Sequence, residues 1–327
     1  MAQLPVTVSP LESTFGAGNE SLNQTTQSQS EPPELYRFTY ISLFICALGV
    51  TGNGLLLSFL IFYIKRTAFT VYTLHLSVAD FVVVLCQAIF HMSSIYYNYY
   101  FHLDTLLECA IFLMFFGYNT GLHLLTAMSV ERCLSVIYPI WYHCQRPKHQ
   151  SAVVCTLLWA LSVLVSGLEN FFCILDMFTF PDCQHVYILS CVLTLVFVQL
   201  MVLSNSILVI QACRHWKPQQ PVKLYAIITT TVVLFLVFAL PLKVLLIWYY
   251  YITTNFSVWK WLPLLNMLSI ISSSANPIVY FVAVSVRRKK NRKKSLKAAL
   301  EKVFEEKPVT GSTENTAQPS PISTSIS

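Results

Sequence analysis

Long apolar stretches alternate with short polar ones along most of this chain. Seven stretches each hold about 20 or more predominantly apolar residues, which is enough for a helix to cross the hydrocarbon core of a bilayer. Backbone groups in lipid must be hydrogen-bonded within the protein, and the pattern lacks the alternation of a transmembrane barrel, so these stretches are predicted to be helices. The predicted spans are residues 39–64, 70–96, 106–137, 151–175, 186–210, 224–251 and 258–284.

Composition supports the same fold class. Of the 327 residues, 55% are hydrophobic and only 11% are charged, whereas soluble domains carry roughly 25% charged residues. We therefore predict an all-α membrane protein, with a seven-transmembrane helix bundle over residues 39–284. The sequence shows no paired catalytic carboxylates, nucleophile constellation, glycine-rich phosphate loop or metal-like histidine spacing, so we predict neither an enzyme nor a metal site.

The positions of the basic residues predict the orientation. If the N-terminus lies outside, every Lys and Arg except Arg37, Lys243 and Lys260 falls on the cytoplasmic side. This bias follows the positive-inside rule, and the opposite orientation would invert it. The net charge of +6 then reflects a basic inner face and not a nucleic-acid-binding surface. We predict a multi-pass plasma-membrane protein with an extracellular N-terminus and a cytoplasmic C-terminus.

The two ends of the chain are predicted to lie outside the bundle. Residues 1–38 form an extracellular disordered N-terminus, because the segment is rich in polar residues and has no apolar core of a signal peptide. Sequons at Asn19 and Asn23 predict glycosylation there. Residues 285–301 combine basic with spaced apolar residues, which predicts a short amphipathic helix on the lipid of the inner leaflet. Residues 302–327 are predicted to be a disordered cytoplasmic tail.

Three predicted spans carry a polar side chain at a similar depth. Asn53, Asp80 and Asn276 each lie about 8 to 11 residues from the cytoplasmic end of their span, which is roughly 12–17 Å along a helix. Because an unpaired Asp in lipid is costly, we expect these side chains to face one another inside the bundle, with Ser272 and Ser273 nearby. Two interpretations stay open: a hydrogen-bonded brace between helices, and a sodium or proton site.

Two adjacent charges, Glu131 and Arg132, close the third span. A guanidinium at this depth can extend to the interface, and its planar fork suits carbonyl and carboxylate partners. One interpretation is a simple charge pair at a helix end, and the other is a contact site for a cytosolic partner.

Short motifs lie at related places in the predicted spans: GN at 52–53, LSVAD at 76–80, ERC at 131–133, Trp159, Pro241 and NPIVY at 276–280. With this spacing over all seven spans, the chain resembles the rhodopsin-like G-protein-coupled receptors. More narrowly, residues 116–155 are similar to the Mas-related receptors. The resemblance implies a receptor that couples an extracellular ligand to heterotrimeric G proteins. Arrestin and receptor kinases are implied partners of its Ser- and Thr-rich tail.

The resemblance also implies roles for the coupling residues. Arg132 matches the arginine that contacts the C-terminal helix of the G protein, and Glu131 matches the acidic neighbour that holds it at rest. Tyr280 would close around the opened helices, while Pro241 would bend the sixth span. Residues that open the second inner loop, where family members contact the G protein, are Tyr138, Pro139 and Ile140.

Four residues bear on the predicted ligand pocket. Met114 stands where amine receptors place an Asp, which argues against monoamine ligands. In the Mas-related family an acid matching Glu169 contacts basic ligands, and Tyr187 stands where some members add a second acid. The resemblance therefore implies a basic peptide or a small cationic ligand. Glu169 and Lys243 are both on the outer half of the bundle, so an internal ion pair between them stays open as an alternative.

Cysteine positions depart from the usual receptor pattern. Leu107 occupies the place where most of these receptors have the cysteine that joins the third span to the second outer loop. Mas-related receptors instead join the tops of spans four and five, which implies a Cys173–Cys183 disulfide here.

Other departures concern activation. Ala239 replaces the aromatic residue that usually precedes the span-six proline, and Gly121 replaces a hydroxyl that commonly assists sodium, which weakens a sodium site at Asp80. No acidic residue opens the sixth span, so Arg132 lacks an ionic partner on that helix. We hypothesise some ligand-independent signalling. A membrane transporter and a channel subunit are the alternative classes, but the sequence shows neither the paired halves of a transporter nor the pore loop of a channel.

Overall fold

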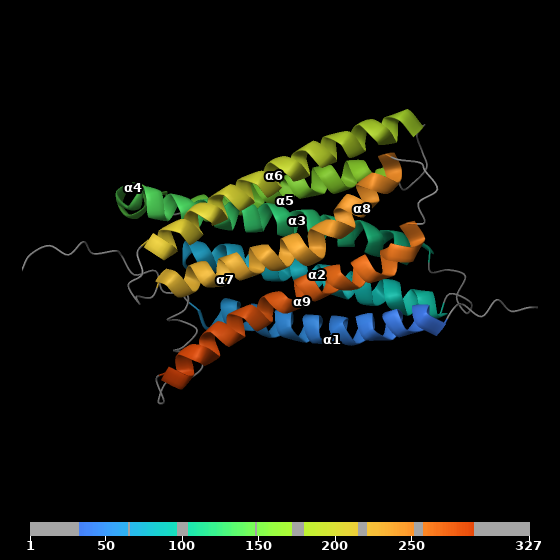
Figure 1. Ribbon diagram of the computed structural model, residues 1–327, viewed down its shortest axis with the longest axis horizontal. Helices are drawn as coiled ribbons and strands as arrows, with labels where there is room; N and C mark the ends of the chain where they lie inside the picture. Colours follow the sequence, from blue (N-terminus) through green and yellow to red (C-terminus); the bar gives the residue numbers. More distant parts are fainter. Residues whose placement is uncertain are drawn as a thin grey trace, which may run out of the picture.

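The computed structural model describes residues 33–64, 66–96, 104–147, 149–171, 180–214, 221–251 and 258–290. They form an elongated bundle of helices that run side by side (Figure 1). Seven helical segments within these residues are long and apolar enough to cross a membrane, which confirms the predicted fold class. The elements are α1 (Pro33–Phe62), α2 (Ala68–Tyr96), α3 (Asp104–Ile137), α4 (Pro139–Cys144), α5 (Gln150–Glu169), α6 (Phe180–Arg214), α7 (Pro221–Leu234), η2 (Phe235–Ala239), α8 (Leu240–Tyr251) and α9 (Val258–Lys290).

Predicted and observed boundaries differ by about six residues at most. The helix α1 begins at Pro33, inside the segment predicted as the N-terminal tail, and other differences lie at the ends of the later helices. The sixth span is one bent rod made of α7, the π-helical segment η2 and α8 (Figure 1). The helix α9 continues without a break to Lys290, so residue 285 is not a helix boundary. Residues 291–301 lie outside the described part of the chain, and the amphipathic helix stays a prediction.

The bend in the sixth span has a covalent cause. Pro241 has no N–H to donate to the carbonyl four residues earlier, and its ring crowds that carbonyl. The wide turn η2, Phe235–Ala239, ends two residues before Pro241, and the N–H of Leu240 donates to the Phe235 carbonyl five residues earlier. Ala239, whose small side chain is buried in the core, leaves room for this turn.

The helix α3 occupies the centre of the bundle. It packs against α2, α5, α6 and α7. In its most apolar stretch of 18 residues, 61% of the residues are buried, compared with 22% in the corresponding stretches of α5 and α6. The large side chains of the core come from several helices and include Leu56, Leu76, Leu122, Met128 and Tyr280. A single central helix therefore contacts most of the others and reaches both ends of the bundle.

The outer surface of the bundle suits a bilayer. Large apolar side chains such as Phe44, Leu157 and Leu203 are exposed there, which is the reverse of a soluble protein. Exposed hydroxyls are satisfied within their own helix: Thr51 donates to the Ala47 carbonyl at 2.8 Å, and Thr156 donates to the carbonyl four residues earlier at 3.0 Å. Such bonds remove the cost of placing a hydroxyl in lipid.

Gly117 allows α3 to approach α2 closely. A Cβ atom at this position would lie 2.7 Å from Val83 Cγ2 and 3.1 Å from the Ala79 carbonyl oxygen, whereas a Cβ at Gly167 would meet nothing within 4 Å. We expect Gly117→Ala to lower the free energy of unfolding of the protein by about 1–3 kcal/mol through overpacking. Gly167→Ala should be neutral or stabilising, because it gains helix propensity without a clash. Thermal unfolding of the purified variants compares them, and a Gly117→Ala midpoint at or above wild type would contradict this.

Candidate functional site

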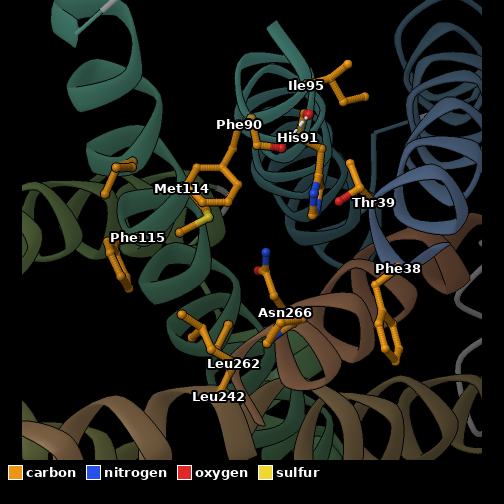
Figure 2. A pocket seen from close by; sticks show the side chains of 13 residues that line it. Phe38, Thr39, Phe90, His91, Ile95, Met114, Phe115, Leu242, Leu262 and Asn266 are labelled. Atoms are coloured by element: carbon orange, nitrogen blue, oxygen red, sulfur yellow. Dashed lines mark hydrogen bonds between the residues drawn. The ribbon is translucent and has the colours of Figure 1, made fainter. Parts of the chain in front are cut away.

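One cavity lies at the predicted outer end of the bundle, where α1, α3 and α9 begin and α2 ends. Its volume is about 390 Å³. Apolar walls come from several helices, and the predicted residue Met114 on α3 lines the cavity together with Phe90, Ile111, Phe115 and Leu262 (Figure 2). Its polar lining residues are Thr39, His91, Ser94 and Asn266. The cavity has the size and largely apolar lining of a small-molecule site.

Glu169 and Lys243 do not line this cavity but bind each other. The Lys243 Nζ atom lies 2.6 Å from Glu169 Oε1, and both side chains are almost fully buried. Ser190 donates a hydrogen bond to the same carboxylate oxygen, and Asn119 Nδ2 lies 3.5 Å from Glu169 Oε2. The alternative left open by the sequence, an internal ion pair, is the arrangement in this structure.

The ion pair and its hydrogen-bond partners come from four helices, and Ser190 is the contribution of α6. Glu169 ends α5, Lys243 lies on α8, and Asn119 on α3 also donates to Ser166 Oγ at 2.8 Å. Tyr187, another residue predicted for the ligand pocket, is buried on α6 and is not among the residues that line this cavity. The sequence singled out Glu169 and Lys243 as pocket candidates. It did not single out Asn119 and Ser190 as partners of the Glu169 carboxylate, although each is a polar residue within a span.

The polar residues of spans one, two and seven meet as expected. Asn276 Nδ2 donates to Asp80 Oδ2 at 2.6 Å, and Asn53 Nδ2 donates to the Ser273 carbonyl at 3.2 Å. Ser272 is buried in the same part of α9. These bonds tie α1, α2 and α9 together, as a brace would.

A sodium ion would find oxygen atoms near this brace. The amide oxygens of Asn53 and Asn276 are buried and have no hydrogen-bond partner among the described residues, and the Asp80 carboxylate is next to Asn276. Oxygen ligands of this kind suit a hard cation, but Gly121 adds no hydroxyl. The ion site therefore stays the second of the two interpretations of this cluster, and the sequence predicts no cofactor.

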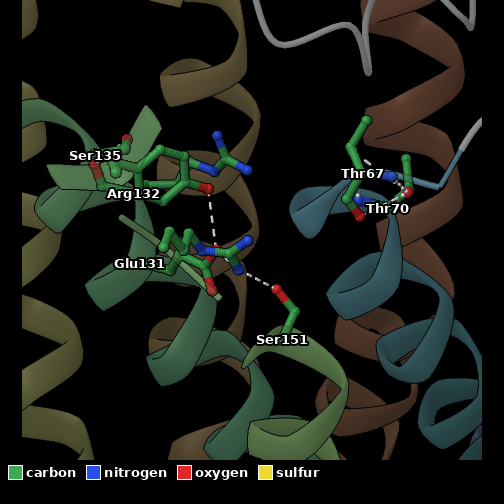
Figure 3. A network of polar contacts seen from close by, with 8 residues as sticks. Thr67, Thr70, Glu131, Arg132, Ser135 and Ser151 are labelled. Carbon is green, nitrogen blue, oxygen red and sulfur yellow. Dashed lines mark hydrogen bonds and ion pairs between the residues drawn. The ribbon is translucent and has the colours of Figure 1, made fainter. Parts of the chain in front are cut away.

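The charges that close α3 lie at the opposite end of the bundle from the cavity. Figure 3 shows Glu131, Arg132 and Ser135 at the end of one helix, with Ser151 on a neighbouring helix. The Glu131 carboxylate pairs with Arg146 and accepts a hydrogen bond from Tyr142 Oη at 3.0 Å. Arg146 also donates to Ser151 Oγ. Glu131 is thus bound by α4 and by the segment that follows it, two partners that the sequence did not predict.

Arg132 is buried against the beginning of α2. Its guanidinium carbon lies 5.1 Å from the centre of the Phe69 ring, and only 4% of the residue is exposed. The ring of Tyr280 lies 6.4 Å from the same Phe69 ring. Phe69 therefore lies close to both Arg132 and Tyr280. The sequence does not reveal this position, because nothing distinguishes Phe69 from the other apolar residues of its span.

The beginning of the second inner loop is open to solvent. Tyr138 and Ile140 are among the most exposed large side chains, and Pro139 begins the short helix α4. A partner approaching this end of the bundle would meet these side chains before it reached Arg132.

Several predicted sites fall where the structure describes no side chains. Asn19, Asn23 and Cys173 lie outside the described residues, and Cys183 lies in α6 at a position whose side chain is not described. The glycosylation sites and the Cys173–Cys183 disulfide stay predictions.

Comparison with known proteins covers nearly the whole chain. Residues 52–280 match the family model described as 7 transmembrane receptor (rhodopsin family). The chain is 62% identical over 321 residues to Mas-related G-protein coupled receptor member H of Rattus norvegicus, covering 97% of this chain and 98% of the relative. Identity to the member H protein of Mus musculus is 61% with the same coverage. The Homo sapiens Proto-oncogene Mas is 43% identical over 275 residues, or 82% of this chain and 83% of that protein.

The seven-helix bundle and these motifs define a membrane receptor. The chain belongs to the rhodopsin family of G-protein-coupled receptors and, within it, to the Mas-related receptors. Both resemblances seen in the sequence are confirmed, and the family consists of receptors and not enzymes. Membership implies coupling to a G protein and an extracellular ligand, which favours this class over the transporter and channel alternatives.

Proposed function

We propose that this chain lies in the plasma membrane with its N-terminus outside and transmits the binding of an extracellular ligand to a heterotrimeric G protein. The observation that carries this proposal is the position of Arg132, which is buried against Phe69 at the end of the central helix. A guanidinium held there by a ring face can be released to bind carbonyl groups of a partner. Exposed Tyr138, Pro139 and Ile140 supply the adjoining contact surface.

The central helix connects the two ends. Met114 in the cavity and Arg132 at the coupling end both lie on α3, roughly 27 Å apart along the helix axis. The sixth span, bent at η2 and Pro241, borders the same cavity through Leu242. A ligand that binds one packing of these helices better than another shifts the population between them, and no chemical step is required.

The finer proposal is a basic peptide ligand that contacts Glu169. Because Lys243 already binds this carboxylate, a cationic group of the ligand would have to displace the lysine ammonium. The energy of that exchange would make ligand binding and movement of α8 interdependent. Such a ligand would also retain the hydrogen bonds that Ser190 and Asn119 make with Glu169.

Nucleotide exchange tests the proposal directly. Purified full-length chain in lipid nanodiscs is expected to accelerate guanine nucleotide exchange on purified G-protein heterotrimers, and basic peptides are expected to accelerate it further. The matched variant Glu169→Gln with Lys243→Met removes both charges and should lose only the peptide response. Exchange no faster than in empty nanodiscs for every heterotrimer class would refute receptor function. An unchanged peptide response in the double variant would remove Glu169 from the ligand site.

A further inference from the structure

The cavity at the predicted outer end is separate from the ion pair proposed as the peptide contact. Its volume of about 390 Å³ lies within the range of roughly 300–1,000 Å³ that is typical of small-molecule sites. Neither Glu169 nor Tyr187 is among its lining residues. Within the described part of the chain, no Asp, Glu, Lys or Arg lines it, so a charged ligand would find no counter-charge in its wall.

Two polar side chains point into the cavity, one of them buried and the other half-buried. Figure 2 shows the imidazole of His91 on α2 and the amide of Asn266 on α9 directed toward its centre from opposite sides. Only 8% of His91 is exposed, and its Nε2 atom has no hydrogen-bond partner among the described residues. A buried polar atom left in this way costs about 1–3 kcal/mol, which a ligand or a water molecule can recover.

Asn266 presents a donor to the same space. Its Oδ1 atom accepts a hydrogen bond from Gln87 Nε2 at 2.7 Å, so the oxygen is already engaged. The Nδ2 atom, which lies at the tip of the side chain in Figure 2, is then the group directed at a ligand. The cavity therefore offers an amide donor on one side and, on the other, an imidazole nitrogen that donates or accepts depending on its tautomer.

The surroundings argue against an ionic ligand. Lys243 lines a much smaller space that adjoins the cavity through Met114, Phe115 and Leu242, but its ammonium group is bound to Glu169. A carboxylate would have to compete with Glu169 for that ammonium, and a cation would be desolvated without compensation. An uncharged group loses far less on leaving water.

We propose that this cavity is a second ligand site, which binds an uncharged and largely apolar small molecule with its hydrogen-bonding end between His91 and Asn266. The apolar body packs against Phe90, Ile111 and Leu262, whose burial supplies most of the affinity. A carbonyl or primary amide end accepts from Asn266 and pairs with the free nitrogen of His91. The site is distinct from the peptide contact at Glu169, which does not line the cavity.

A matched series of three probes tests the charge preference. Biphenyl-4-carboxamide, biphenyl-4-carboxylate and 4-(aminomethyl)biphenyl share one apolar body and differ in the charge of the end group near neutral pH. Binding of radiolabelled amide to the purified full chain in nanodiscs is measured, with the other two as competitors. We expect saturable amide binding at least tenfold tighter than that of either charged probe. An amine or carboxylate that binds as tightly as the amide, or no saturable amide binding, would overturn the proposal and indicate a water-filled cavity or an ionic site.

Variants locate the bound probe. Met114→Trp fills the cavity and should abolish amide binding, whereas His91→Phe keeps the ring volume and should weaken it roughly fivefold, the loss of one hydrogen bond. The double variant Glu169→Gln with Lys243→Met should bind the amide like wild type. Amide affinity unaffected by both cavity variants would exclude this site. Unfolding curves identify any variant that does not fold. If Met114→Trp does not fold, the amide affinity of His91→Phe still tests whether the probe binds in this cavity. Absence of saturable amide binding to the wild-type chain, together with normal nucleotide exchange, would contradict this site alone and leave receptor function intact.

Discussion

Lys243→Met is expected to remove most of the folded receptor from the cell surface. Glu169 is 5% exposed, so without the lysine ammonium its charge would stay buried with only hydrogen bonds from Ser190 and Asn119. Breaking a buried ion pair from one side typically costs about 3–5 kcal/mol, which is a large part of the stability of a folded protein. Methionine keeps a similar length and volume, so the loss of charge and not of packing dominates the effect.

Removing both charges should restore the stability and the surface display of the protein to nearly the wild-type level. The double variant Lys243→Met with Glu169→Gln leaves no uncompensated charge, and glutamine can still accept from Ser190. Surface display of an N-terminally tagged chain and thermal unfolding after purification measure the recovery. Arg37→Met, which removes one exposed positive charge from the same predicted end, is the control and should behave like wild type. A Lys243→Met single variant as stable as wild type would show that the pair contributes little.

Arg132→Ala is expected to lower receptor-catalysed nucleotide exchange at least tenfold, to the level of empty nanodiscs. The guanidinium is the group proposed to bind the G protein, and alanine retains neither its charge nor its planar set of donors. Removal of this side chain also frees the face of Phe69, which costs about 0.5–2 kcal/mol of cation–π attraction and leaves the bundle folded.

A second arginine provides the control for charge. Arg214 lies exposed in the last turn of α6, so Arg214→Ala removes one positive charge from the same predicted end without disturbing the buried contact. Exchange rates of both variants are compared at equal amounts of folded receptor, as judged by unfolding curves. If Arg132→Ala retains exchange close to that of Arg214→Ala, the proposed coupling role of Arg132 is wrong.

The seven spans were predictable because lipid imposes one dominant constraint. A run of about 20 apolar residues has few alternatives to a spanning helix, and the depth of a residue follows from its distance to the end of the run. That arithmetic placed Asp80 and Asn276 at one level, and the structure joins them at 2.6 Å. The prediction worked because an isolated carboxylate in lipid needs a partner and few polar side chains lie at that depth.

Partners at the ends of the bundle were harder to predict. The proposed hold of Glu131 on its neighbour Arg132 stays a prediction, whereas the partners that the structure shows for Glu131, Arg146 and Tyr142, were not predicted. Positive residues in inner loops are common for reasons of topology alone, so Arg146 carried no distinguishing signal. The cavity and the contact of Phe69 with Arg132 depend on how helices rotate about their own axes, which apolar runs without clear periodicity do not specify.

The wide turn in the sixth span determines which side chains face inward beyond it. Each residue of an α-helix advances the direction of the following side chains by about 100° and the chain by 1.5 Å. If Phe235–Ala239 changed from π-helical to ordinary α-helical hydrogen bonding, this turn would hold one residue fewer. The whole of α8 would then rotate about its axis by about 100°. Lys243 would leave Glu169, and Leu242 would leave the cavity wall, in the same movement. The backbone conformation of these five residues therefore sets the orientation of Lys243 and Leu242, and with it the geometry of both proposed binding regions.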